Sequence, residues 1–212
     1  MRLVSTPRIE FLRALGAEIL HNYGRGRSLI AVEGAVRPVR EAFADDLAAV
    51  FEEKGHPVYR ASMRYFQRSR DDQEQFGPET AERIYRRRDD YDVLRRVLLD
   101  PFRMGGSAGF VTRQFDPDSR TWVQPTWTTA PPDASLIVDG EFLHRPELRG
   151  LWAYSMLLEG QTGGDAVVAT GGGTLAGAYV LYRAESNPRE LAGALIDVSD
   201  PEHPARSFAD SC

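Results

Sequence analysis

Apolar residues along the chain are spaced in two ways, and the two spacings predict an alternation of helices and buried strands. Phe11, Leu15 and Ile19 recur at four-residue intervals, which is the spacing of one helix face. Residues 29–33 form instead a short apolar run that stops at Gly34, as a buried strand does. The same criteria predict helices over 7–23, 40–54, 78–88, 90–99, 146–151 and 178–192, and strands over 29–33, 57–62, 134–138, 153–158 and 194–198.

Strands that alternate with helices are typical of a parallel sheet. We therefore expect an α/β fold in which one parallel β-sheet is covered by helices on both faces, and 212 residues suit a single domain over 1–212. Residues 1–24 would add an N-terminal helix. Residues 104–132 are rich in Gly, Pro, Thr and aromatic residues, which predicts a hairpin or an irregular excursion. Gly, Ala and Thr dominate residues 159–177, which predicts a flexible loop.

Charge and cysteine content narrow the classes of function. The net charge of −5 argues against a general nucleic-acid binder. The basic run at 83–88 is followed at once by aspartates, so a solvated helix face is favoured over a phosphate-binding patch. The single cysteine, Cys212, allows no internal disulfide and fits a cytoplasmic protein. No signal peptide and no membrane-spanning run is evident, and no His or Cys spacing favours a metal site.

The stretch LIAVEGAVRPVREAFADDLA, residues 29–48, has the layout of a phosphate-binding loop. A strand runs into Gly34, four residues follow, and then a helix is expected. Such a loop needs Gly-Lys-Ser/Thr at its end, because Lys reaches the phosphates and the hydroxyl holds Mg²⁺. This chain has Val39-Arg40-Glu41 there.

Each change in this loop removes something that a polyphosphate requires. Pro38 has no backbone N–H to donate, and Val39 adds a side chain where glycine is needed. Arg40 keeps a positive charge but is not equivalent to lysine. Glu41, expected near the start of a helix, replaces the hydroxyl that binds Mg²⁺ and would repel a phosphate. We therefore expect that ATP does not bind here in the usual way and that no cofactor or metal is used.

Several stretches in a fixed order carry a family resemblance: FADDLA at 43–48, RAS at 60–62, DYDVLRR at 90–96, LLDP at 98–101, TAPPDA at 129–134, VDGEFLHRPELR at 138–149 and DVSDP at 197–201. Together they resemble the actinobacterial uridine kinase-like proteins of the P-loop nucleoside and phosphoribulose kinase group. The resemblance covers about residues 25–205 and implies a P-loop kinase-like three-layer sandwich. It would make 159–177 the remnant of a lid loop.

Two further departures from that family concern catalysis. Where the resemblance places an acidic pair after Arg-Ala-Ser, this chain has Met63-Arg64-Tyr65-Phe66, so the expected general base is missing. The sequence has no arginine between Gly150 and Arg183, where the family's lid arginines would lie. Together with the altered loop, these changes predict that phosphoryl transfer has been lost.

The residues expected at the carboxyl ends of the strands define the candidate site. As acid, base or charge-stabilising groups we select Glu33, Arg64, Asp139, Glu141 and His144. As substrate-binding groups we select Arg40, Glu41, Tyr65, Phe66, Phe115, Trp122 and Trp127. Such a set suits elimination, isomerisation or cyclisation of a small molecule without a nucleotide, as in a bacterial biosynthetic pathway. We expect no nucleic-acid partner and no membrane partner. A homodimer is one permitted state.

Other interpretations of the same residues remain open. Glu33, Arg40, Arg64 and Asp139 could pair with one another and fill the old site, and His144 and the tryptophans could be structural. The chain could instead be a non-catalytic pseudokinase that binds a partner. It could also be a residual kinase that uses Arg40 in place of lysine and Asp139 to hold Mg²⁺.

Overall fold

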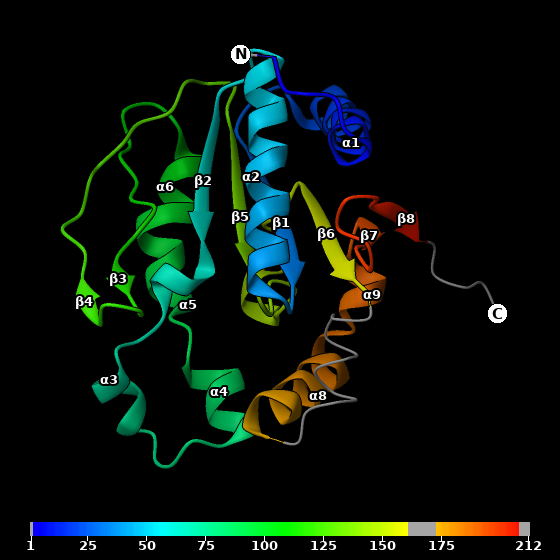
Figure 1. The fold of residues 1–212 in the computed structure, drawn as a ribbon. Helices are drawn as coiled ribbons and strands as arrows, with labels where there is room; N and C mark the ends of the chain where they lie inside the picture. The colour runs from blue at the N-terminus through cyan, green and yellow to red at the C-terminus, as the bar shows by residue number, and fades with distance from the viewer. Residues whose placement is uncertain (1, 161–172, 208–212) are drawn as a thin grey trace.

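The computed structural model describes residues 2–160 and 173–207, and its centre is a six-stranded sheet (Figure 1). The strand order is β2-β5-β1-β6-β7-β8. All neighbouring pairs are parallel except β7–β8. The strands are β1 (Ser28–Gly34), β2 (Val58–Ser62), β5 (Ser135–Gly140), β6 (Tyr154–Glu159), β7 (Ala194–Asp197) and β8 (Ala205–Ser207). The expected α/β class with a mostly parallel sheet is confirmed.

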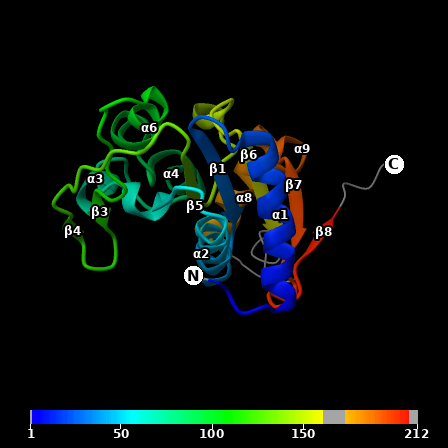
Figure 2. The same ribbon diagram turned by 90° about the horizontal axis from the view of Figure 1, so that it is seen from above.

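Helices cover both faces of the sheet, as the apolar strands require. On one face, α1 (Pro7–Tyr23) and α2 (Arg37–Glu53) pack against the side chains of Ile30, Val32 and Ile137. On the other face, the neighbouring strand residues Leu29, Ala31 and Leu136 pack against a continuous helical segment. That segment consists of α5 (Tyr91–Leu94), a π-helical turn η2 (Arg95–Leu99) and α6 (Asp100–Met104). Figure 2 shows α2 and α6 on opposite sides of β1 and β5.

A third group of elements lies at the carboxyl ends of the strands (Figure 1). Helix α4 (Ala81–Arg87) packs against α8 (Thr174–Ser186), and Tyr85, Phe142, Tyr179 and Tyr182 form their shared apolar cluster. The remaining elements are short: η1 (Met63–Phe66), α3 (Arg70–Glu74), the hairpin β3 (Phe115–Asp116) and β4 (Thr121–Trp122), η3 (Pro146–Leu148) and α9 (Pro188–Leu191). These elements surround the place where a ligand would bind in an open parallel sheet.

Most predicted elements are present, with shifts at their ends. Helix α2 begins at Arg37, three residues before the expected start, with Pro38 in its first turn. The helix expected over 178–192 begins earlier and is split at Asn187, whose φ of 43° is left-handed, before Pro188. The hairpin within 104–132 is present, whereas strand β8 and helix α3 were not predicted. Residues 161–172 of the expected loop lie outside the described residues.

Within residues 2–160 and 173–207, no helix has the length and apolar character needed to cross a membrane.

Candidate functional site

The turn between β1 and α2, where the sequence has the layout of a phosphate loop, is largely taken up by helix. Only Ala35 and Val36 separate the end of β1 from Arg37, the first residue of α2. The N–H of Arg40 donates to the carbonyl of Val36 at 3.0 Å, and Pro38 has no N–H. A phosphate loop works by turning several free N–H groups toward the phosphates. This turn therefore has fewer amides to offer than an open loop would.

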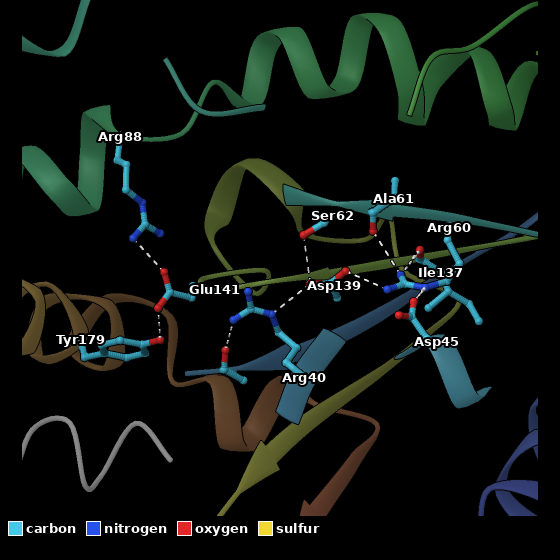
Figure 3. Close-up of polar contacts among 11 residues, drawn as sticks. Arg40, Asp45, Arg60, Ala61, Ser62, Arg88, Ile137, Asp139, Glu141 and Tyr179 are labelled. Carbon is cyan, nitrogen blue, oxygen red and sulfur yellow. Dashed lines mark hydrogen bonds and ion pairs between the residues drawn. The ribbon is translucent and has the colours of Figure 1, made fainter. Parts of the chain in front are cut away.

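The side chain of Arg40 is buried and directed at Asp139 from β5 (Figure 3). Its Nε donates to Asp139 Oδ2 at 3.1 Å, and its Nη1 donates to the carbonyl of Gly34. Asp139 also accepts from Arg60 Nη2 at 2.9 Å and from Ser62 Oγ at 3.0 Å. We call Arg40, Arg60, Ser62 and Asp139 the Asp139 cluster.

This cluster joins α2, through Arg40, to the neighbouring strands β2 and β5. The carboxylate of Asp139 has none of its surface exposed, and each of its oxygens already accepts from a guanidinium. A buried carboxylate is stable when charged partners and hydrogen bonds compensate for its lost hydration. The geometry therefore supports the interpretation in which Arg40 and Asp139 pair and occupy the old site, but it does not include Glu33 or Arg64 in that pairing.

Glu33 points to the opposite face of the sheet. In the parallel register Val32 lies beside Asp139, so Glu33, the next residue, faces the other way. Its Oε2 accepts from His144 Nδ1 at 2.7 Å, from the Tyr182 hydroxyl at 2.7 Å and from the N–H of Leu143 at 2.8 Å. His144 Nε2 lies 3.0 Å from Ser155 Oγ. We call Glu33, His144, Ser155 and Tyr182 the Glu33 cluster.

Glu141 belongs to a third set of contacts, between α4 and α8 (Figure 3). Its carboxylate contacts Arg88 Nη1 at 2.7 Å and accepts from the Tyr179 hydroxyl at 2.8 Å. Burial, reinforced by the nearby negative charge of Glu141, raises the pKa of Tyr179 well above its ordinary value. The Tyr182 pKa is raised for the same two reasons, with Glu33 as the neighbouring charge. Both phenols therefore stay protonated and act as hydrogen-bond donors at neutral pH.

An open pocket of about 220 Å³ lies beside the Asp139 cluster, between α2, β2 and η1. Its polar lining is unusually rich in charge for its size. We call it the Tyr65 pocket, and its walls are Glu41, Asp45, Arg60, Ala61, Ser62, Arg64, Tyr65, Thr112, Arg113 and Asp139.

Tyr65 is flanked by two guanidinium groups in this pocket. Arg64 Nη1 lies 3.3 Å from the Tyr65 hydroxyl, and Arg64 is held in turn by Asp118 at 2.6 Å from its Nη2. The guanidinium of Arg113 lies 4.1 Å from the centre of the Tyr65 ring. Since arginine can only donate, the phenol oxygen accepts from Arg64, and its own proton is available to a ligand.

Two opposite charges line the Tyr65 pocket without being paired. Arg60 and Arg64 form ion pairs with aspartates. Among the residues that the structure describes, neither the Glu41 carboxylate nor the Arg113 guanidinium forms an ion pair, with each other or with another group. Glu41 lies in the second turn of α2 and points to this pocket, so it does not cap the helix, whose N-cap is Val36.

The aromatic residues that were expected to bind substrate lie elsewhere. Phe66 and Phe115 are buried, and Phe115 packs against Trp122 with 5.3 Å between ring centres. Trp122 and Trp127 are 61% and 63% exposed on the excursion that includes β3 and β4, and none of these four residues lines the Tyr65 pocket. Trp122 ends the hairpin and Trp127 lies in the segment after it, where its ring lies against Gly109.

Sequence reasoning selected Glu33, Arg40, Asp139 and His144 but missed most of their partners. The alternation of side chains along β2 would have placed Arg60 and Ser62 on the same face as Asp139. Arg113, Ser155, Tyr179 and Tyr182 come from segments whose position depends on tertiary packing, so no local signal identified them. In the described part of the chain, no group of three or more His, Cys, Asp or Glu side chains could hold a metal ion.

Comparisons with solved structures show relatives of the fold. The chain is similar to a possible uridine kinase from Bacillus stearothermophilus, with a TM-score of 0.70 and 20% identity over 89% of this chain and 96% of the other. It is also similar to a candidate fructose transport system kinase from Silicibacter sp. TM1040, with a TM-score of 0.59 and 20% identity over 82% and 89% of the two chains. A third structure, the YGR205w protein, gives a TM-score of 0.57 and 15% identity over 98% and 100%.

No protein-family model matches the sequence, and no curated protein matches it. At 20% identity the structural likeness concerns the fold, so the chain has the three-layer α/β fold of these kinase-like structures.

Proposed function

We propose that this chain is an enzyme that no longer transfers phosphate from ATP and that performs acid–base chemistry on a small anionic molecule in the Tyr65 pocket. One observation carries the proposal. Arg40, in the turn that has the layout of a phosphate loop, is directed at Asp139, while the adjoining pocket is open and is lined by the Glu41 carboxylate and the Arg113 guanidinium, which form no ion pair among the described residues.

Three features count against ATP as a substrate. The turn before α2 has only two residues, and Pro38 in the first turn of α2 has no N–H to donate. Arg40, in the position of the phosphate-loop lysine, is 4% exposed and is directed at Asp139. Asp139, the residue that could have held Mg²⁺, is bonded to two guanidinium groups, so a divalent cation would have to displace both of them.

The charges that line the Tyr65 pocket suggest a division of roles. The planar guanidinium of Arg113 suits a substrate carboxylate or phosphate, which it can bind through two N–H groups. Glu41 is placed as the general base. The Tyr65 hydroxyl, whose oxygen accepts from Arg64, is placed as the proton donor.

These roles define one class of reaction. Glu41 would remove a proton from a carbon next to the substrate's carbonyl or carboxylate group, and Tyr65 would donate a proton to the oxygen on which charge develops or to a leaving group. The two transfers balance in an isomerisation, an elimination or a cyclisation. Arg64 and Arg113 would stabilise the developing negative charge.

A thermal-unfolding titration with small carboxylates and inorganic phosphate tests the binding step. A ligand at ten times its dissociation constant stabilises the folded state by about 1.4 kcal/mol. In a chain of this size that raises the Tm by about 3–6 °C. We expect such a rise with at least one of these anions, and we expect Arg113→Gln to abolish it.

Arg87→Gln is the matched control for this titration. Arg87 is also exposed and also stacks on an aromatic ring, that of Phe76, but it lies outside the Tyr65 pocket. Its replacement should leave the rise in Tm intact. The proposal would be contradicted if no anion stabilised the protein, or if both variants responded alike.

Solvent deuterium exchange then separates an enzyme from a non-catalytic binding protein. With the carboxylate that binds best, the C–H next to its carboxylate group should exchange with D₂O in the presence of the protein, as followed by proton NMR. Glu41→Gln should slow this exchange by about 100-fold or more while binding persists. Binding without any exchange would favour the pseudokinase interpretation.

A further inference from the structure

Ser155, His144 and Glu33 form a line of hydrogen bonds on the face of the sheet opposite the Asp139 cluster. Ser155 Oγ lies 3.0 Å from His144 Nε2, and His144 Nδ1 lies 2.7 Å from Glu33 Oε2. The three side chains come from β6, from the segment after β5 and from β1. A hydroxyl next to an imidazole that is oriented by a carboxylate is the arrangement that activates a serine nucleophile.

The partners of Glu33 fix where the protons lie. Its carboxylate receives the N–H groups of Leu143 and His144 and the hydroxyl of Tyr182, all of which are donors. Glu33 is therefore an acceptor toward the imidazole as well, so His144 carries its proton on Nδ1. Nε2 is then the free lone pair, and the Ser155 hydroxyl donates to it. This is the tautomer that a general base toward Ser155 needs.

Ser155 and His144 are not sealed in the core, since both line a cavity of about 110 Å³. Leu148, Trp152 and Leu191 give the cavity an apolar wall, and the exposed Arg149 and Gly150 lie at its edge. A single water needs only about 10–15 Å³ by the same measure, so a small acyl group fits. The apolar wall would accept the acyl chain, and Arg149 would favour a negatively charged leaving group.

A backbone donor stands beside the serine. The N–H of Gly193, which directly precedes β7, lies 3.2 Å from Ser155 Oγ. A side chain at Gly193 would come within 3.3 Å of the Ser155 carbonyl, so glycine allows this close approach. When Oγ becomes part of an ester, this N–H is released from it and is placed to stabilise the adjacent oxyanion.

We propose that Ser155 is the nucleophile of a second catalytic site, in which His144 and Glu33 activate it toward small activated esters. Ser155 Oγ attacks the carbonyl carbon, and its proton passes to His144 Nε2. The bond from that carbon to the leaving oxygen breaks, and His144 returns the proton to the alkoxide. Water then attacks the acyl carbon and gives one proton to His144, the bond from that carbon to Oγ breaks, and His144 returns the proton to Oγ, which releases the carboxylic acid and restores the serine.

A second serine–histidine pair in the chain lacks what the first one has. Ser135 Oγ lies 2.9 Å from His56 Nε2, but Ser135 is fully buried, and His56 forms no ion pair with a carboxylate in the described residues. Burial lowers the pKa of His56. This pair is an internal control, because its serine–histidine distance is similar, whereas Ser135 is inaccessible, has no orienting acid in the described part of the chain and also bonds Ser28 Oγ at 2.8 Å.

Covalent labelling with a fluorophosphonate tests the proposal. The reagent forms a bond between its phosphorus and an activated serine oxygen and releases fluoride, and mass spectrometry of peptides locates the adduct. We expect labelling at Ser155, none at Ser135, loss of labelling in Ser155→Ala and unchanged labelling in Ser135→Ala. His144→Gln should slow labelling by about 100-fold. Tyr65→Phe and Arg113→Gln should have no effect, so this test is independent of the Tyr65 pocket.

A cysteine variant keeps the test decisive if His144→Gln does not fold. In Ser155→Cys, the adjacent imidazole should favour the thiolate, so alkylation by iodoacetamide should remain fast at pH values where an ordinary thiol, with a pKa near 8.5, is slow. The native Cys212 is the internal reference. The proposal is overturned if folded protein shows no adduct at Ser155, or if the introduced thiol follows the same pH dependence as Cys212.

Discussion

Asp139 is a carboxylate held between two guanidinium groups with no exposed surface, and its surroundings determine what it can do. In the interpretation as a residual kinase, this carboxylate would hold Mg²⁺. Here its oxygens are directed at Arg40, Arg60 and Ser62. Removing one partner would leave a buried charge poorly compensated, whereas the complete cluster holds β2, β5 and α2 together.

The contribution of this cluster can be measured by deleting one partner. Arg40→Met should lower the free energy of unfolding by about 3–5 kcal/mol, because Asp139 then loses a buried charged partner. Chemical denaturation of the variant and the parent checks this value. Arg37→Met is the control, since Arg37 is exposed and lies 3.8 Å from Asp118, a contact worth at most about 1 kcal/mol. Equal losses in both variants would contradict a structural role for the cluster.

The sequence indicated several of the candidate site residues but not how their side chains are grouped. Glu33 and Asp139 were expected in one cleft, yet adjacent positions in the register send their side chains to opposite faces. The opposite orientation of the two side chains follows from the alternation of side chains along a strand, once the pairing of β1 with β5 is known. The exposed positions of Trp122 and Trp127 could not be inferred, because the excursion that carries them has no periodic pattern.

Among the elements, α2 begins three residues before its expected start, inside the segment that has the layout of a phosphate loop. Pro38 was interpreted as the loss of an N–H in a loop, but proline also fits the first turn of a helix, where its missing donor has no intrahelical partner. The helix therefore extends into the segment that would otherwise bind phosphate. Sequence pattern located the element correctly but could not decide between a loop and an additional helical turn.

Contacts between α1 and α2 give the fold a sensitivity to acid. Arg13 of α1 binds both oxygens of Glu53 at 2.8 Å, and the N–H of Leu3 donates to Glu53 at 2.8 Å. The Arg13 hydrogen bonds, reinforced by that of Leu3, lower the pKa of Glu53 from 4.5 to about 2. The ionised form is thus favoured in the folded state.

We expect this contribution to stability to be complete above pH 4.5 and to be lost as the pH falls toward 2. Glu53→Gln should therefore weaken the dependence of the free energy of unfolding on pH across that range, as measured by urea denaturation at a series of pH values. Glu52→Gln is the control, because Glu52 is exposed and its carboxylate forms no ion pair among the described residues. An unchanged slope in Glu53→Gln would contradict the assignment.

For the whole molecule, the pattern of apolar runs was sufficient to predict the α/β class and the order of most elements. Buried strands such as β1 and β5 have clear sequence signals, and helices on both faces follow from them. The antiparallel β8 and the break at Asn187 depend on tertiary packing and on local backbone geometry, so they were not predicted. The likeness to kinase structures extends over the fold, while the chemistry has to be argued from the side chains in each cleft.

We propose that the chain's own Arg40 and Asp139 fill the position that nucleotide phosphates would take. Isothermal titration calorimetry with Mg·ATP tests it most directly. We predict no saturable heat up to millimolar nucleotide, with the parent protein folded throughout as judged by circular dichroism. Saturable, Mg²⁺-dependent binding with a micromolar Kd would contradict the account and would restore the interpretation as a kinase.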